Sequence, residues 1–386
     1  MAFPYVHCVA ELASSANEYG GTLAAAERLR QRYPHHLDRV ASFFKWLASS
    51  QNTYAETYFQ QERLNMLEHL EKEFTLHPYF ANPNMSTAEV TWHGLIHARM
   101  KDFRQQLEAT GRRDFDMEKD RCAMYSFYAR HGLPTLAVHG VWHSLDALLA
   151  DVHDGRAYGN VSDWPIFWKA CHLTQSSSYA TRSMNARPLP GGETEELAGW
   201  LKSKWDFRAN DYERVWVEDG NVITRDIPPG FLLQAPFKGA RYQTVGRVSV
   251  GLPEVRVEVL WGRPYLALLD GVMVLMRNGG AQDFGSLSAF GGTPPVLTDH
   301  WFFTEAHDAC VWDVAGRAAN AAGVDSIRID IFLDRSEPSH CILNENSLSS
   351  GMAYWGHEKF MAQLWSEPHV KKLYRLRETS TGVLEQ

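Results

Sequence analysis

Cysteine is scarce in this chain, and its placement argues against a disulfide framework. The number of cysteines is odd, and no two of them form a Cys-x-x-Cys pair. We therefore predict reduced thiols in a cytoplasmic protein. The cysteines are Cys8, Cys122, Cys171, Cys310 and Cys341.

Positive charge and long apolar runs are also lacking. The 38 Lys and Arg residues are outnumbered by 46 Asp and Glu residues, for a formal net charge of −8. This balance argues against general affinity for nucleic acid or for anionic membranes. No uncharged apolar run approaches membrane-spanning length, and the first residues, which include Glu11, do not resemble a secretory signal. We expect neither a nucleic-acid nor a membrane partner.

The rest of the composition is that of a globular protein with more than one core. The chain has 386 residues, of which 45% are hydrophobic and 22% charged, so two to three structural units are expected. Helical periodicity is clear in residues 22–33 and 52–74. A further helix is predicted over residues 86–110, where Ser86 and Glu89 have the spacing of a capping box.

Two segments near the end of the chain bring polar side chains onto neighbouring strands. Residues 326–333 alternate apolar side chains with Arg328 and Asp330, which is typical of a strand with one polar face. A second apolar strand begins at Cys341 and ends at Glu345, Asn346 and Ser347. One carboxylate from each strand on the same side would suit Mg²⁺. Taken alone, the pattern fits ordinary solvated positions on a half-buried strand equally well.

Upstream segments favour the functional interpretation. An apolar run over residues 164–169 ends in Lys169 and leads into a hydroxyl-rich loop, which suits phosphate binding. Residues 227–239 read as a short apolar strand between Pro-Pro-Gly and Gly. Residues 254–265 read as a period-2 strand, a glycine turn and the start of a second strand.

The order of these segments, over roughly residues 117–351, resembles that of the ATP-grasp superfamily. The local sequence of the motifs is most similar to the teichuronopeptide-biosynthesis-like branch of that superfamily. The resemblance implies an α+β fold in which two lobes clamp ATP, preceded by a helical N-terminal region. The implied divisions are a helical region at 1–112, a pre-grasp or linker segment at 113–160, lobe A at 161–240 and lobe B at 241–386.

The resemblance also implies roles for particular residues. The implied nucleotide contacts are Lys119, Lys169, His172, Ser176, Ser177, Ser178, Leu232, Leu233, Gln234, Ala235 and Phe237. The implied metal ligands are Asp330, Glu345 and Ser347, with Asn346 nearby, and the implied catalytic arginines are Arg256 and Arg328. Residues 176–178 and 279–295 are the candidate lids.

Three positions depart from the family pattern. The hinge usually carries Glu where this chain has Gln234, and the loop after Lys169 is rich in Ser instead of Gly. The metal motif usually ends in Asn where this chain has Ser347, and a hydroxyl is a weaker ligand for Mg²⁺.

The function implied is an ATP- and Mg²⁺-dependent carboxylate–amine ligase that acts through an acylphosphate. Its partners would be a small-molecule carboxylic acid and an amine, and a homodimer is possible. Two alternatives stay open: a small-molecule kinase of the same fold, and a catalytically weak nucleotide-binding scaffold.

Overall fold

The computed structural model describes most of the chain after residue 36. The described residues are 37–86, 90–111, 117, 120–173, 180–208, 219, 223, 227–239, 242–243, 250–251, 253–284, 296–352, 354 and 356–378. The helix predicted over residues 22–33 lies outside them.

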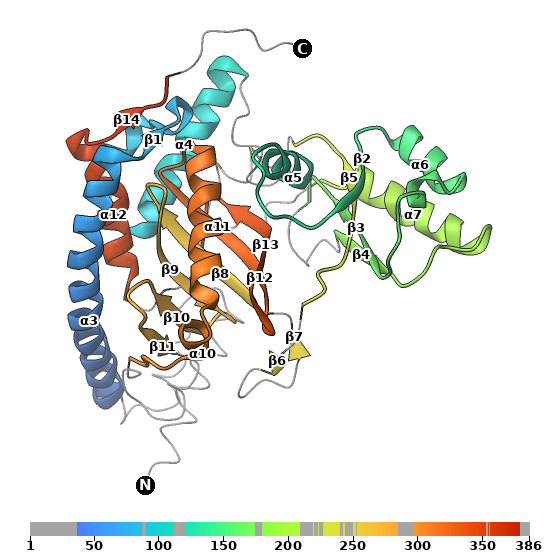
Figure 1. Ribbon diagram of the computed structural model, residues 1–386. Coiled ribbons are helices and arrows are strands. Elements are labelled where there is room, and N and C mark those ends of the chain that lie inside the picture. Colours follow the sequence, from blue (N-terminus) through green and yellow to red (C-terminus); the bar gives the residue numbers. More distant parts are fainter. Residues whose placement is uncertain are drawn as a thin grey trace.

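A six-stranded antiparallel sheet forms the larger lobe (Figure 1), with strand order β11-β10-β9-β8-β12-β13. Its strands are β8 (Glu254–Leu260), β9 (Arg263–Leu269), β10 (Met273–Met276), β11 (Ala281–Asp283), β12 (Ser326–Asp334) and β13 (Glu337–Ser347). The predicted strands at 254–265, at 326–333 and ending at 347 are confirmed. The turn between β8 and β9 contains Trp261 and Gly262, both with positive φ, 53° and 76°. Glycine tolerates this conformation without steric cost.

Alternation along the strands separates an apolar face from a polar one. In β8 the side chains of Val255, Val257 and Val259 are fully buried in the main core. Helix α11 (His307–Ala322) packs against β8, β12 and β13, and the short helix α10 (Trp301–Thr304) precedes it. The residues that alternate with these valines, at positions 254, 256 and 258, are charged and share the opposite face.

A four-stranded antiparallel sheet, ordered β2-β5-β3-β4, forms the smaller lobe. Its strands are β2 (Val138–Trp142), β3 (Ile166–Ala170), β4 (Thr181–Met184) and β5 (Phe231–Gln234). Helices α6 (Leu145–His153) and α7 (Gly192–Asp206) provide residues of a second core that includes Trp168 and Phe231. Because β2 pairs with β5, this sheet crosses the predicted boundary at residue 160; the domain division itself stays a prediction.

Helix α5 (Arg121–Arg130) lies between the two sheets (Figure 1). Smaller elements complete the chain. They are the parallel pair β1 (Thr75–Leu76) and β14 (Arg375–Leu376), the pair β6 (Tyr242–Gln243) and β7 (Val250–Gly251), and the 3₁₀ turns at Pro78–Phe80, Pro83–Ser86 and Arg156–Tyr158.

The helical N-terminal region is part of the larger lobe's core. Helices α3 (Leu37–Lys72) and α4 (Trp92–Thr110) contribute buried residues to the same cluster as the six-stranded sheet, together with α12 (Glu358–Lys371). The predicted capping box at Ser86 is wrong, because Ser86 ends a 3₁₀ turn and α4 begins six residues later. Thr91 caps α4 instead, its hydroxyl accepting a hydrogen bond from the Gly94 N–H at 3.0 Å.

The prediction of reduced thiols is wrong for four of the five cysteines. Cys122 is disulfide-bonded to Cys171, and Cys310 to Cys341. The partners are 49 and 31 residues apart in the sequence, so no short spacing motif announced either bond. Scattered cysteines can meet through the fold alone.

A buried ion pair joins α4 to the start of β12. The guanidinium of Arg99 bonds to the carboxylate of Asp325 and donates to the carbonyls of Ser326 and Leu348 at 2.7 and 2.9 Å. From α12, Trp365 Nε1 donates to Asp325 Oδ2 at 2.6 Å, and His369 Nε2 lies 2.7 Å from the same oxygen. Burial alone would raise the pKa of Asp325, but Arg99 and His369 outweigh it and hold that pKa below its ordinary value.

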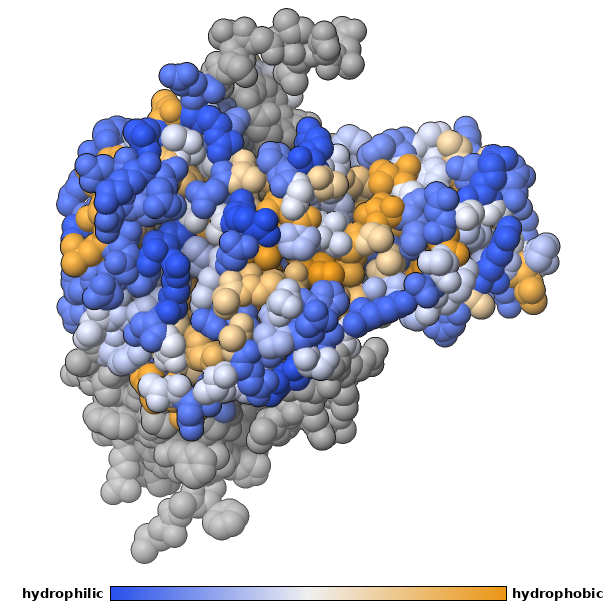
Figure 2. Space-filling model, in the orientation of Figure 1, coloured by the Kyte–Doolittle hydropathy of each residue, from blue (hydrophilic) through white to orange (hydrophobic). Residues whose placement is uncertain are grey.

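Most of the surface visible in Figure 2 is hydrophilic, and apolar residues gather where the two lobes meet. Among the described helices, none combines the length and apolar composition that crossing a bilayer requires.

Replacing Arg99 by Met should lower the free energy of unfolding by about 3–5 kcal/mol, because the change leaves a buried carboxylate without its main cation. Arg317→Met is the matched control. Arg317 pairs with Asp313 on the exposed side of α11 at 2.9 Å, and its loss should cost less than about 1 kcal/mol. Urea unfolding of both variants measures the difference; equal losses would contradict a special role for Arg99.

Candidate active site

Strand register brings the predicted residues of β8, β12 and β13 onto one polar face. Asp330 is paired with Glu345 on one side and with Arg256 on the other. Arg328 is likewise paired with Ser347 and with Glu258. Directly opposite residues of antiparallel strands place their side chains on the same face, at contact distance. The predicted Arg-x-Asp and Glu-x-Ser motifs therefore lie side by side.

Asp330 is the centre of the charges on this face. Arg328 donates to both of its carboxylate oxygens, Nε to Oδ1 at 2.7 Å and Nη2 to Oδ2 at 2.8 Å. Arg256 Nε lies 3.9 Å from Oδ2, and Arg256 Nη2 forms a closer pair with Glu254, at 3.1 Å. The bidentate contact between Arg328 and Asp330 is strong and geometrically specific.

The electrostatics of this face favour a cation. Burial raises the pKa of Asp330 to about 6; Arg328 opposes the shift, whereas Glu254 and Glu345 add to it. A carboxylate that is buried near two other carboxylates is stabilised in its charged form by any added positive charge. Three carboxylates, those of Asp330, Glu345 and Glu254, therefore share this face with the guanidinium groups of Arg328 and Arg256.

Lys169 lies on the face of the smaller sheet that carries Leu232 and Gln234. It is paired with Leu232 in the register of β3 and β5, and Phe167 is paired with Gln234. Burial lowers the pKa of Lys169 to about 8, and Arg121 lowers it further, while Glu345 and Glu254 oppose the shift.

Helix α5 provides the geometric link between the two sheets. The Arg121 N–H at its start donates to the carbonyl of Cys171, just after β3, at 3.0 Å, and the Tyr125 hydroxyl donates to the carbonyl of Asn344 in β13 at 2.9 Å. The polar faces of the two sheets are therefore joined through this helix.

Gln234 has the polar side chain of the predicted hinge, and this side chain can form more hydrogen bonds than it does in the structure. Its side chain is fully buried, and Oε1 has no hydrogen-bond partner among the described residues. Burial raises the pKa of the nearby Tyr125 hydroxyl to about 12, and a hydrogen bond with the Gln234 side chain opposes this shift. A buried amide oxygen without a partner costs free energy unless a ligand satisfies it. A nucleotide base could do so.

The remaining hinge residues have ordinary surroundings. Leu232 and Leu233 are fully buried, each in the core of a different lobe. Ala235 N–H donates to the carbonyl of Ala137 at 2.9 Å. The ring of Phe237 stacks on Phe332 with a centroid distance of 5.5 Å, so the hinge contacts β12 directly.

His172 is held by backbone groups. Its Nδ1 accepts from the Gly230 N–H at 3.3 Å, so Nε2 carries the proton and donates to the carbonyl of Lys204 at 3.1 Å. Burial lowers its pKa to about 4, which keeps the ring neutral. Both ring nitrogens are therefore engaged in joining β5 to α7, and these contacts support a structural role more than the predicted nucleotide contact.

Several predicted residues cannot be placed. Lys119, Ser176, Ser177 and Ser178 lie outside the described residues, as do positions 285–295 of the second candidate lid. Ser347 is described and buried, and its hydroxyl accepts from the Ser349 N–H at 3.3 Å. The assigned roles of all site residues stay predictions.

The structure adds residues that the sequence interpretation missed. Glu254 accepts from Asn344 Nδ2 at 2.9 Å, and Glu258 is fully buried and accepts from the Tyr354 hydroxyl. Both lie two residues from Arg256, so the period of the predicted strand already placed them on its face. No local signal marked Tyr354, which reaches Glu258 from a segment 96 residues away.

A Lys169→Met variant should bind a non-hydrolysable ATP analogue roughly 10- to 100-fold more weakly, because it loses a charge-assisted contact in a partly buried site. In the unmodified protein, affinity should hold below pH 8 and fall above it, since Lys169 loses its proton near pH 8 and phosphate binding then requires proton uptake. The variant should lack this dependence. Lys202→Met, at an exposed position of α7, is the control. Calorimetric titration from pH 6.5 to 9 measures both effects; unchanged affinity in Lys169→Met would contradict a phosphate contact.

No protein-family model and no curated protein matches the chain. Among solved structures, it is similar to D-alanyl-alanine synthetase A from Vibrio cholerae, with 14% identity over 71% of this chain and 74% of that one and a TM-score of 0.40. It is also similar to the ATP-grasp ligase PsnB complexed with a phosphomimetic variant of its minimal precursor, Mg and ADP, with 13% identity over 70% and 66% and a TM-score of 0.34. A biotin carboxylase from Campylobacter jejuni shows 10% identity over 74% and 54% and a TM-score of 0.41. Likenesses this weak do not establish a family, so a function for this chain must rest on its own residues.

Proposed function

We propose that this protein is an ATP- and Mg²⁺-dependent carboxylate–amine ligase of the ATP-grasp type. The observation that carries the proposal is the meeting of two polar faces. Lys169 lies on the smaller sheet and the paired residues Asp330 and Glu345 lie on the larger one. Helix α5 bonds to the chain beside both positions, at Cys171 and at Asn344. A cation facing a carboxylate cluster is the arrangement that a metal-bound triphosphate needs on its two sides.

The nucleotide would lie between the sheets, with its base at the hinge. The side-chain amide of Gln234 can both donate to and accept from a purine edge. Lys169 would neutralise phosphate charge as a point cation. Leu232, between these two positions on the same face, would supply an apolar surface for the base or the ribose.

The donor set of β12 and β13 fits Mg²⁺. Asp330 and Glu345 would hold the ion, with the hydroxyl of Ser347 as a weaker third ligand. When bound, Mg²⁺ neutralises the phosphate oxygens and the charge that develops during transfer. Both oxygens of Asp330 already accept hydrogen bonds from Arg328, so that carboxylate would use its remaining lone pairs.

Arg256 and Arg328 are suited to the acid substrate. Each guanidinium offers more donors than its present partners use, and a planar fork matches a carboxylate or a transferring phosphate. A substrate carboxylate held here would attack the γ-phosphate and give an acylphosphate, which an amine would then intercept. Exclusion of water protects such an intermediate from hydrolysis.

The partners we propose are a small carboxylic acid and an amine, without nucleic acid or membrane. We propose the cytoplasm as the compartment, since ATP is its co-substrate. There the two disulfides would face cellular thiol reductants. The teichuronopeptide-like branch and the homodimer stay predictions.

Asp330→Asn and Glu345→Gln should each reduce ADP formation to background, because each removes a negative ligand that the metal needs. Asp330→Asn also leaves Arg328 without its carboxylate, so thermal unfolding must accompany the assay. Glu337→Gln, at an exposed position of the same hairpin, is the control. Near-normal turnover of either site variant at saturating Mg²⁺ would remove these residues from the metal site.

Release of ADP and phosphate should require both an acid and an amine. The phosphate should carry one ¹⁸O atom from a labelled substrate carboxylate, because that oxygen attacks the γ-phosphorus. Screening mixtures of amino acids and other small acids, followed by mass spectrometry of the phosphate, tests this outcome. A stable phosphate ester without amide product or label transfer would identify a kinase, and absence of any turnover would favour the scaffold alternative.

A further inference from the structure

Helix α5 makes its first set of contacts with the smaller sheet, beside Lys169. Cys122, in the first turn of the helix, is disulfide-bonded to Cys171, two residues after Lys169. The Arg121 N–H donates to the carbonyl of Cys171 at 3.0 Å, and its guanidinium donates to the carbonyl of Ala170 at 3.2 Å. The end of β3 is thereby fixed to the start of α5 by a covalent bond and by hydrogen bonds.

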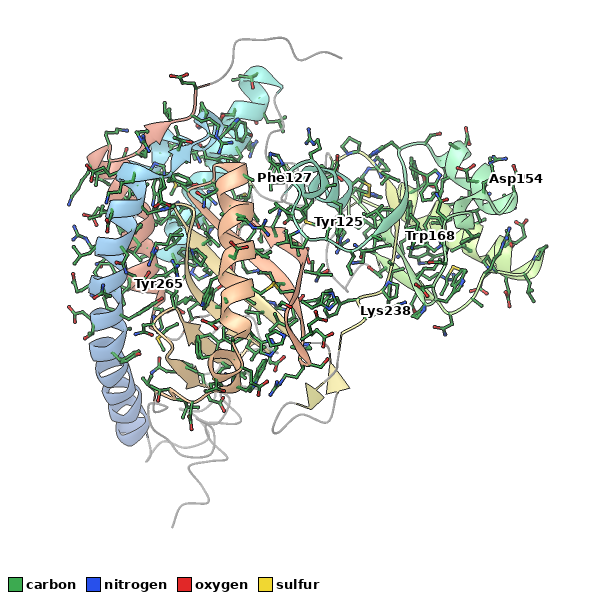
Figure 3. The ribbon with its side chains drawn as sticks, in the orientation of Figure 1. Tyr125, Phe127, Asp154, Trp168, Lys238 and Tyr265 are labelled. Carbon is green, nitrogen blue, oxygen red and sulfur yellow. A yellow bond between two sulfur atoms is a disulfide. The ribbon has the colours of Figure 1, made fainter. Side chains whose placement is uncertain are left out.

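The second set of contacts is with β13 of the larger sheet. The Tyr125 hydroxyl donates to the carbonyl of Asn344 at 2.9 Å, and Asn346 Nδ2 donates to the Tyr128 hydroxyl at 2.7 Å. Asn344 and Asn346 are the neighbours of Glu345 in the chain. Both tyrosines are buried, and Figure 3 shows Tyr125 between the two sheets.

The helix that joins these contacts is short and well defined. It has 10 residues, and Asp120 caps it by accepting from the N–H groups of Cys122 and Ala123 at 2.8 and 3.1 Å. A capped helix with fixed side chains at its start and along one face holds its two ends at a constant separation.

We infer that α5 is a positioning element of the site, setting the separation between Lys169 and Glu345, and that the buried Cys122–Cys171 disulfide is its covalent attachment to the smaller sheet. The inference rests on the proposed nucleotide site. Tyr128 acts as a positioning residue through Asn346. Without the disulfide, Lys169 and its strand would lose their covalent link to α5, and the nucleotide would bind less tightly.

The second disulfide is an internal control. Cys310 and Cys341 join α11 to β13, two elements of the same lobe, so their bond does not span the two sheets. It should not affect the separation between Lys169 and Glu345.

The experiment compares Cys122→Ser/Cys171→Ser with Cys310→Ser/Cys341→Ser. Three quantities are measured: free thiols of the native protein by mass spectrometry, affinity for a non-hydrolysable ATP analogue, and hydrogen exchange in β3 and at the end of β13. The first variant should bind the analogue about tenfold more weakly or worse, a loss of ~1.4 kcal/mol, with faster exchange in both strands. The second variant should stay within about twofold of the unmodified protein. If the first variant does not fold, dithiol treatment of the Cys310→Ser/Cys341→Ser variant replaces it, because that variant retains the Cys122–Cys171 bond without the control disulfide.

The Tyr128→Phe variant tests the positioning role through the Mg²⁺ dependence of analogue binding, which a purely structural role of Tyr128 would leave unchanged. It should raise the Mg²⁺ concentration needed for half-maximal analogue binding several-fold and leave metal-free affinity unchanged. Tyr265→Phe is the control, because the buried Tyr265 hydroxyl has no hydrogen-bond partner among the described residues.

Free thiols at Cys122 and Cys171 in the native protein, or an exchange change limited to β3, would overturn the inference. If the unmodified protein binds no nucleotide, the proposed function fails, and the exchange measurement alone then decides the role of α5.

Discussion

The buried pair of Arg99 and Asp325 fixes the part of the larger sheet on which the site depends. Asp325 immediately precedes β12. Its carbonyl accepts a hydrogen bond at 2.7 Å from the N–H of Trp261, which lies in the β8–β9 turn. Arg99 also binds the carbonyls of Ser326 and Leu348, the first residue of β12 and the residue after β13. A shift of one residue would turn every side chain of a strand to the other face. This ion pair therefore keeps Arg328, Asp330 and Glu345 on the polar face.

The buried charges of the site are tolerated because they are paired. The same pairing leaves fewer of their donors and acceptors for a ligand. Arg328 occupies both oxygens of Asp330, and Glu258 lies opposite Arg328 with its own partner in Tyr354. Burying one of these charges alone would be costly, so removing any partner exposes the cost of the others. A bound cation and an anionic substrate would add charges of opposite sign to this cluster and would change its pairing.

Local patterns were sufficient for the strands of the site and insufficient for their surroundings. Alternation along residues 326–333 and 254–260 placed Arg256, Arg328 and Asp330 correctly on strands, because a period of two is a local property. The disulfides and the backbone contacts of His172 depend on residues that meet only in the folded chain. A capping-box pattern at Ser86 was misleading because the chain forms a 3₁₀ turn there, before α4.

A sequence motif identifies Glu345, but its position in the fold depends on contacts with residues far away in the sequence. On one side, Tyr125 and Tyr128 bond to the neighbours of Glu345 from 219 and 218 residues away. On the other, Arg99 bonds to Leu348 from 249 residues away. Helices α4 and α5 therefore both bond to the short stretch of chain around the end of β13. Because α4 belongs to the helical N-terminal region, that region helps to position the strand that carries Glu345.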